Sequence, residues 1–317
     1  MKKPPLIILS GATAVGKTDL SIHLAQKIGG EIISADSMQV YKGFDIGTAK
    51  ISKEEMQGVP HYLIDELEPD EEFNVFEFQK RASSYIRSIH AKGKIPIITG
   101  GTGFYIQSVL YDIEFTSSET DTSYRRELEQ FAKEQGPQAL HHLLEEADPE
   151  AAGQIHANNI KRTIRALEYF KETGQRISLH NEQQRLRHPA FNAAYFVLNR
   201  DRDVIYDRIN QRVDIMLQQG LVQEVRSLLE RGVSPDSLAM QGLGYKEIIR
   251  YLNNELTYEE AVDLIKKSTR HFAKRQLTWF RREKDVIWMN YEEYLSEEEM
   301  LAKMIDLLKE KNIVPLS

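Results

Sequence analysis

Residues 11–18 read GATAVGKT, a complete G-x-x-x-x-G-K-[ST] phosphate-binding loop. The loop follows an apolar run, Leu6 to Leu9, and precedes an amphipathic stretch that begins at Lys17. A strand that ends in such a loop and turns into a helix points several backbone N–H groups, and the positive end of the helix dipole, at one spot. The sequence therefore predicts a site for a phosphate ester, and the motif by itself leaves the esterified group open.

The loop residues have distinct expected roles. Glycines at 11 and 16 allow the backbone angles and the close approach that a side chain would prevent. Lys17 brings a positive charge to the phosphate oxygens, and the Thr18 hydroxyl is suited to bind a Mg²⁺ ion that shares those oxygens. The predicted diphosphate-binding residues are Gly11, Ala12, Thr13, Ala14, Val15, Gly16, Lys17 and Thr18.

The composition is that of an ordinary globular protein, with 317 residues of which 41% are hydrophobic and 28% are charged. There is no cysteine, so disulfides and thiolate metal sites are excluded. The sequence has no apolar run near the roughly 18 residues that a membrane span needs. We therefore expect a cytoplasmic protein without a membrane partner, and a monomer.

The charge is distributed unevenly. The chain as a whole carries a formal charge of −7. Residues 266–284, KKSTRHFAKRQLTWFRREK, hold eight lysines or arginines and one glutamate, so this basic segment is +7 and the remaining chain is −14. A strongly basic island on an acidic protein predicts a polyanionic partner, and its aromatic residues are typical of RNA binding.

Short apolar runs alternate with helical periodicity, which predicts an α/β fold. The expected strands are residues 6–9, 31–34, 95–99, 195–198 and 286–289. Such an alternation favours a P-loop NTPase-like parallel sheet with helices on both faces. Residues 116–189 hold helical patterns at 124–135, 137–146 and 158–173 and no convincing strand. We therefore expect an inserted all-helical subdomain bounded by polar linkers at 116–123 and 185–192. The catalytic core would then comprise residues 1–115 and 190–317.

Two further stretches lie just after expected strands, where ligands of parallel sheets gather. ADSMQVY, residues 35–41, follows the second strand and contains Asp36, and GGTGFY, residues 100–105, follows the third. An aspartate after a strand is often only a turn or helix-cap residue. Here it would share one edge of the sheet with the phosphate loop, which makes it a candidate for catalysis.

These motifs, with GYKEI and RQLTWFRR later in the chain, resemble the tRNA dimethylallyltransferase family, and the resemblance extends from residue 11 to residue 282. It implies that the loop holds the diphosphate of dimethylallyl diphosphate and that the acceptor is N6 of the adenosine 3′ of the anticodon in tRNA. Asp36 would take the proton from this amino group, while Lys17, a Mg²⁺ bound by Thr18, and Arg212 would stabilise the departing diphosphate. The resemblance also implies a set of tRNA-binding residues: Asp36, Ser37, Met38, Gln39, Thr102, Arg125, Lys161, Arg162, Arg165, Gly244, Tyr245, Lys246, Lys274, Arg275 and Arg281.

Two other classes of protein share the phosphate loop. A kinase of a nucleotide or small metabolite would explain residues 11–18, but residues 95–99 lack the terminal aspartate expected of a Walker B strand, and a kinase does not explain the basic segment. A nucleotide-dependent switch without covalent chemistry would need no base at Asp36. Within the basic segment, Phe280 is expected in the core, whereas Lys267, Arg270, Lys274 and Arg281 lie near one helix face.

Overall fold

The structure is a computed structural model that describes residues 3–115 and 123–315. The chain divides into two compact units, Met1–Leu110 with Pro189–Ser317 and Tyr111–His188. Of the polar linker predicted at residues 116–123, residues 116–122 lie outside the described residues. Each unit has its own buried core, and the units are described separately.

The first unit contains a six-stranded sheet in the order β3-β2-β4-β1-β5-β6, in which every neighbouring pair is parallel. The strands are β1 (Pro5–Gly11), β2 (Gly30–Ser34), β3 (His61–Tyr62), β4 (Ile95–Gly100), β5 (Asn192–Asn199) and β6 (Val286–Asn290). All five predicted strands are present. The two-residue β3 was not predicted, because a run this short carries no hydrophobic period.

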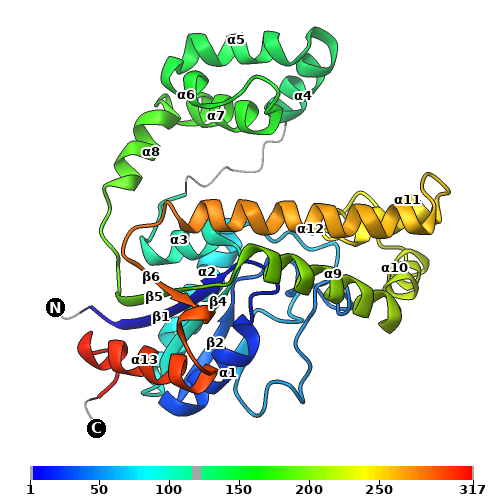
Figure 1. The fold of residues 1–317 in the computed structure, drawn as a ribbon. Coiled ribbons are helices and arrows are strands. Elements are labelled where there is room, and N and C mark those ends of the chain that lie inside the picture. The colour runs from blue at the N-terminus through cyan, green and yellow to red at the C-terminus, as the bar shows by residue number, and fades with distance from the viewer. Residues whose placement is uncertain (1–2, 116–122, 316–317) are drawn as a thin grey trace. The chain divides into compact units, whose positions relative to one another are not determined.

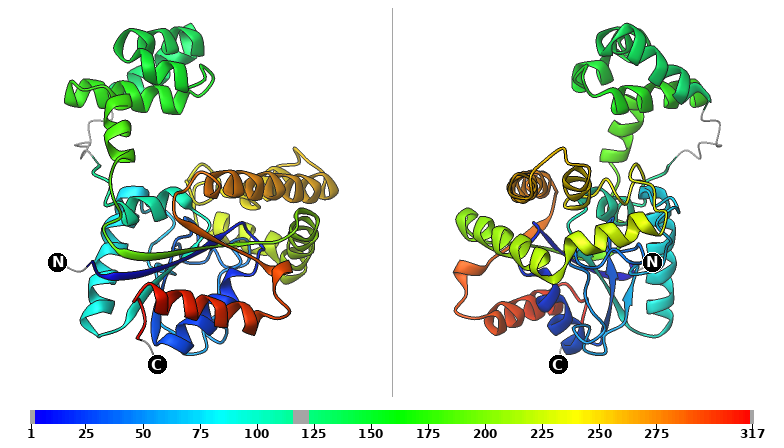
Figure 2. Two further views of the ribbon diagram at one scale, coloured as in Figure 1. Left: turned by 60° about the vertical axis from the view of Figure 1, so that its left-hand side comes forward. Right: turned by 90° about the vertical axis from the view of Figure 1, so that its right-hand side faces the viewer.

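Helices cover both faces of the sheet, as the alternating sequence pattern predicts (Figures 1 and 2). On one face, α1 (Lys17–Ile28) and α13 (Glu297–Glu310) pack on alternate strand residues such as Ile7, Leu9 and Phe196. On the other face, α2 (Val75–Ala91) contacts β2 and β4, and α3 (Gly103–Leu110) packs on α2. Burial of both faces explains why the strands are almost continuously apolar.

The remaining helices of the first unit follow β5. They are α9 (Arg202–Gln219), α10 (Leu221–Glu230), α11 (Tyr245–Leu252) and α12 (Tyr258–Phe280), with a short 3₁₀ turn, η1 (Tyr291–Glu293), after β6. The long α12 contains most of the basic segment and packs against α3, α9, α11 and β1 (Figure 1). Phe280 is fully buried, which confirms its predicted place in the core.

In the described part of the second unit, every secondary structure element is helical. The helices are α4 (Ser123–Gln135), α5 (Pro137–Ala147), α6 (Pro149–Gln154), α7 (Ile160–Thr173) and α8 (Ile177–Arg185). Leu140 and Leu144 of α5 are fully buried and form a core with apolar residues of α4 and α7. Neither unit contains, among the described residues, a helix with the length and apolar character that a bilayer crossing requires.

Candidate active site

The phosphate-binding loop connects β1 to α1, and its two glycines are required by their surroundings. Gly11 and Gly16 have φ angles of 148° and 111°, which side-chain-bearing residues rarely adopt. A Cβ atom on Gly11 would lie 2.6 Å from the carbonyl oxygen of Leu198, and one on Gly16 would lie 2.8 Å from the hydroxyl oxygen of Tyr291. Residues far along the chain therefore fix the conformation of the loop.

Three carbonyl groups of the loop are bound from outside. Arg208 Nε donates to the Ala14 oxygen at 2.7 Å, Arg200 Nε donates to the Val15 oxygen at 3.1 Å, and the Tyr291 hydroxyl donates to the Gly16 oxygen at 3.3 Å. In a trans peptide the N–H points away from the carbonyl of the same peptide group. The N–H groups that follow Val15 and Gly16 therefore point toward the inside of the loop, where an anion would bind.

Lys17 lies inside this loop. Its Nζ donates to the carbonyl oxygens of Gly11 at 3.1 Å and Ala12 at 2.7 Å. Burial, and next the positive charge of Arg212, lower the pKa of Lys17 to about 7, while the Asp36 carboxylate opposes this shift. The charges of Arg212 and Asp36 thus both act on Lys17, so three of the four predicted catalytic side chains lie within electrostatic reach of one another.

Asp36 is held next to the GGTGFY loop by backbone contacts between the ends of β2 and β4. The Ala35 N–H donates to the Thr99 oxygen at 2.7 Å, and the Thr102 N–H donates to the Ala35 oxygen at 3.3 Å. A Cβ atom on Gly100 would lie 2.3 Å from the Ala35 oxygen, so only glycine allows this close approach. Asp36 and the half-buried Thr102 are therefore neighbours at the carboxyl edge of the sheet.

The Asp36 carboxylate is oriented by its own turn. Its Oδ1 accepts hydrogen bonds from the backbone N–H groups of Met38 at 2.8 Å and Gln39 at 3.3 Å. Burial raises the pKa of Asp36, and these two hydrogen bonds and the Lys17 charge limit the rise. The result is a half-buried carboxylate that is more basic than one in water, which suits a proton acceptor.

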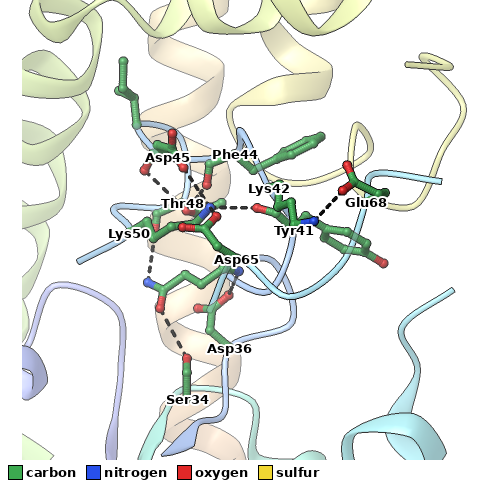
Figure 3. A network of polar contacts seen from close by, with 12 residues as sticks. Ser34, Asp36, Tyr41, Lys42, Phe44, Asp45, Thr48, Lys50, Asp65 and Glu68 are labelled. Carbon is green, nitrogen blue, oxygen red and sulfur yellow. Dashed lines mark hydrogen bonds and ion pairs between the residues drawn. The ribbon is translucent and has the colours of Figure 1, made fainter. Parts of the chain in front are cut away.

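The segment after Asp36 is fixed by polar contacts with distant residues (Figure 3). The buried Lys50 ammonium donates to the Tyr41 carbonyl at 2.7 Å and binds the carboxylates of Asp45 and Asp65. From α10, the Glu224 carboxylate accepts the consecutive N–H groups of residues 45–47 at 2.7 to 3.1 Å. These contacts hold the conformation of the segment that follows Asp36 in the chain.

The GLGYK motif, residues 242–246, packs against the segment that follows Asp36. The Tyr245 side chain is fully buried and donates its hydroxyl to Glu224 at 2.6 Å. A Cβ atom on Gly242 would lie 2.8 Å from Met38 Cε, and the Gly244 N–H donates to Glu247 Oε2 at 2.8 Å at the start of α11. Tyr245, which the resemblance implies to contact tRNA, is thus occupied inside the protein, whereas the Lys246 side chain is 44% exposed.

The basic residues of α12 and its C-cap lie mostly on the surface. Lys274, Arg275 and Arg281 are exposed, as are Lys267 and Arg282. Trp279 faces inward, since a Cβ atom on Gly103 would lie 2.2 Å from its indole ring. The helix therefore presents cations to solvent on one side and contacts the GGTGFY loop on the other.

The other four predicted tRNA-binding residues, Arg125, Lys161, Arg162 and Arg165, belong to helices of the second unit. Arg125 makes a bidentate ion pair with the buried Glu168, at 2.8 and 2.9 Å. Lys161 and Arg162 are exposed at the start of α7, and Arg165 is half-buried one turn later.

The residues suited to a metal ion are few. Thr18 is exposed at the start of α1, and its hydroxyl has no hydrogen-bond partner within residues 3–115 and 123–315. In the same described ranges there is no cluster of three or more histidines or carboxylates that could hold a metal. This donor set fits Mg²⁺, which keeps several waters and is bound through substrate phosphates and one or two protein oxygens.

Sequence reasoning missed three residues that shape this site. Tyr291, Glu224 and Gln276 each fix a site loop from a distant element. Glu224 and Gln276 lie within helices, whereas Tyr291 directly follows β6 but belongs to none of the motifs of the resemblance. Gln276 lies within RQLTWFRR, one of the motifs of the resemblance, and this was the only signal that could have indicated it.

A phosphate loop and the carboxylate of Asp36 at the same edge of a parallel sheet are typical of an α/β enzyme that acts on a phosphate ester. Residues 39–283 match the family model described as IPP transferase. The chain is 60% identical over 310 residues to a tRNA dimethylallyltransferase of Lachnoclostridium phytofermentans, which covers 98% of this chain and 99% of that protein. It is 49% identical to a tRNA dimethylallyltransferase of Clostridioides difficile, with coverage of 98% and 99%.

Solved structures agree with this assignment. The crystal structure of a tRNA isopentenylpyrophosphate transferase from Staphylococcus epidermidis is 44% identical, with a TM-score of 0.72 and coverage of 97% of this chain and 100% of that one. A eukaryotic dimethylallyltransferase described as acting on tRNA is 29% identical, with a TM-score of 0.83 and coverage of 97% and 80%. The chain belongs to the tRNA dimethylallyltransferase family.

Proposed function

We propose that this protein transfers the dimethylallyl group of dimethylallyl diphosphate to N6 of the adenosine 3′ of the anticodon in tRNA and releases diphosphate. The proposal is carried by the position of Asp36 at the same edge of the sheet as the phosphate loop, where the charges of Asp36 and Arg212 both act on Lys17. One side of this group suits an anionic leaving group and the other suits the removal of a proton.

On the donor side, the loop amides and Lys17 bind the diphosphate. As the bond between the allylic carbon and the bridging oxygen breaks, negative charge grows on that oxygen. Lys17 and Arg212 offset this charge, and both are partly removed from water, where their effect is larger. A Mg²⁺ ion held by Thr18 would add Lewis-acid stabilisation of the same leaving group.

On the acceptor side, Asp36 acts as the general base. The adenine amino group is a weak nucleophile because its lone pair is delocalised into the ring. The new C–N bond forms as the C–O bond breaks, and the proton lost from N6 passes to the Asp36 carboxylate. Thr102, adjacent through the Ala35 contact, and Ser37, Met38 and Gln39 contact the acceptor nucleotide in this proposal.

Recognition of the RNA follows from access. A base stacked in an anticodon loop does not reach the edge of a sheet, so it is extruded into the site. The exposed cations Lys274, Arg275 and Arg281, with Lys246, bind tRNA phosphates in the proposed complex. Arg125, Lys161, Arg162 and Arg165 contribute contacts from the second unit, and the enzyme acts as a monomer.

The proposal is tested by supplying labelled dimethylallyl diphosphate, Mg²⁺ and unmodified tRNA, with ATP turnover measured in parallel. We expect the label to become covalently attached to the RNA with release of one diphosphate per transfer, and no dependence on ATP. Label that stays off the RNA while ATP is consumed would instead support a kinase.

A further inference from the structure

Gln276 joins two loops that are far apart in the sequence. Its Oε1 accepts a hydrogen bond from the Thr13 N–H of the phosphate loop at 2.9 Å. Its Nε2 donates to the carbonyl oxygen of Gly101 in the GGTGFY loop at 3.0 Å. Gln276 is buried, with 7% of the residue's surface exposed, so water competes little for either bond.

Both ends of the amide are needed for this connection. An amide is the uncharged side chain that accepts at one end and donates at the other. Space is also matched, since a Cβ atom on Gly101 would lie 2.1 Å from Gln276 Nε2. The bond from Thr13 also withdraws that N–H from anion binding, which leaves the phosphate to the later amides of the loop.

The two connected loops serve opposite sides of the reaction. In the function proposed above, the loop of Thr13 holds the leaving diphosphate, and the loop of Gly101 carries Thr102 beside the acceptor. We propose that Gln276 is a positioning residue that fixes the distance between the allylic donor and the acceptor nucleotide. This inference rests on the proposed function.

Gln276 lies on α12 beside two of the cations that are proposed to bind RNA. Lys274 and Arg275 precede it directly and are exposed, whereas Gln276 faces the loops. An RNA phosphate bound to either cation would restrain the same helical turn that holds the two loops.

Kinetics of two variants at this position test the proposal. Gln276→Met keeps the approximate volume and removes both bonds, while Gln276→Glu keeps an acceptor for Thr13 but faces the Gly101 carbonyl with a second acceptor. A displacement of about 1 Å between reacting groups can cost roughly 100-fold in rate. We expect kcat to fall by about 10- to 100-fold in both variants. The KM for tRNA should change by less than about threefold in both variants. The KM for the donor should also change by less than about threefold in Gln276→Met, which adds no charge near the diphosphate.

A matched control separates positioning from packing. Gln79→Met removes a similar bond, from Gln79 Nε2 to the Ser108 carbonyl at 2.9 Å, between α2 and α3. We expect this variant to keep the wild-type kcat while its melting temperature changes as much as that of Gln276→Met. Wild-type kcat in both Gln276 variants, or a loss fully explained by a smaller folded fraction, would overturn the inference. If the wild-type enzyme transfers no dimethylallyl group, the proposed function fails and the role of Gln276 fails with it.

Discussion

Lys17 donates to carbonyl groups of the phosphate loop, where it would also bind the diphosphate. Its pKa of about 7 has a measurable consequence for this binding. The nearby diphosphate favours the charged ammonium, so binding raises this pKa. Above about pH 7 the free enzyme is partly neutral at Lys17, and we expect binding to take up a proton and to weaken as the pH rises. Calorimetry at about pH 8 in buffers of different ionisation enthalpy measures this uptake. Lys17→Arg, which stays charged, should show none, and an equal uptake in both proteins would contradict the assignment.

Asp36 provides the second test at this scale. Replacement by asparagine keeps the size and an oxygen that can accept from the Met38 N–H, but removes the basic group. We expect the rate of transfer to fall by about 10²- to 10⁴-fold, with tRNA affinity nearly unchanged. Single-turnover rates and filter binding measure the two quantities. A variant that keeps its rate would exclude Asp36 as the base.

At the scale of elements, the second unit depends on one buried cap. Asp148 begins α6, accepts the Ala151 N–H at 3.0 Å, and also accepts both the N–H and the hydroxyl of Ser178 at the start of α8. Asp148→Ala leaves buried donors without a partner, so we expect a loss of about 1–3 kcal/mol in the stability of this unit. Limited proteolysis within residues 123–188 and thermal unfolding measure the loss. Asn159→Ala, at the more exposed cap of α7, should cost less, and equal effects would argue against the buried network.

Helices with a clear apolar period in their own sequence were predicted well, and shorter helices were not. The helices at 124–135, 137–146 and 158–173 were predicted within two residues of the observed α4, α5 and α7. Their apolar period is a local signal, and so are the start signals of two of them, Pro137 of α5 and Asn159 of α7. The shorter α6 and α8 were missed, because fewer than three turns give little periodicity and their ends are fixed by a contact between Asp148 and Ser178.

For the whole molecule, the excess of positive charge on α12 predicts how RNA binding depends on salt. Each phosphate contact that is lost reduces the slope of log affinity against log salt by roughly 0.7 to 0.9. We expect the double change Lys274→Ala with Arg275→Ala to weaken tRNA binding and to reduce the magnitude of this slope by about 1.4 to 1.8. Lys53→Ala with Lys80→Ala, two exposed lysines outside the basic segment, is the matched control. An unchanged slope in the α12 variant would remove these cations from the RNA interface.

The sequence by itself determined the parallel sheet, the phosphate loop and the position of Asp36 after a strand. These features depend on neighbouring residues, because apolar runs, glycine conformations and strand ends are properties of short segments. Only the tertiary structure decided how the loops are held. Gln276 lies 263 residues from Thr13, and Tyr291 lies 275 residues from Gly16. A hydrogen bond between such distant residues leaves no period or spacing in the sequence, since it exists only after the sheet and α12 have packed together.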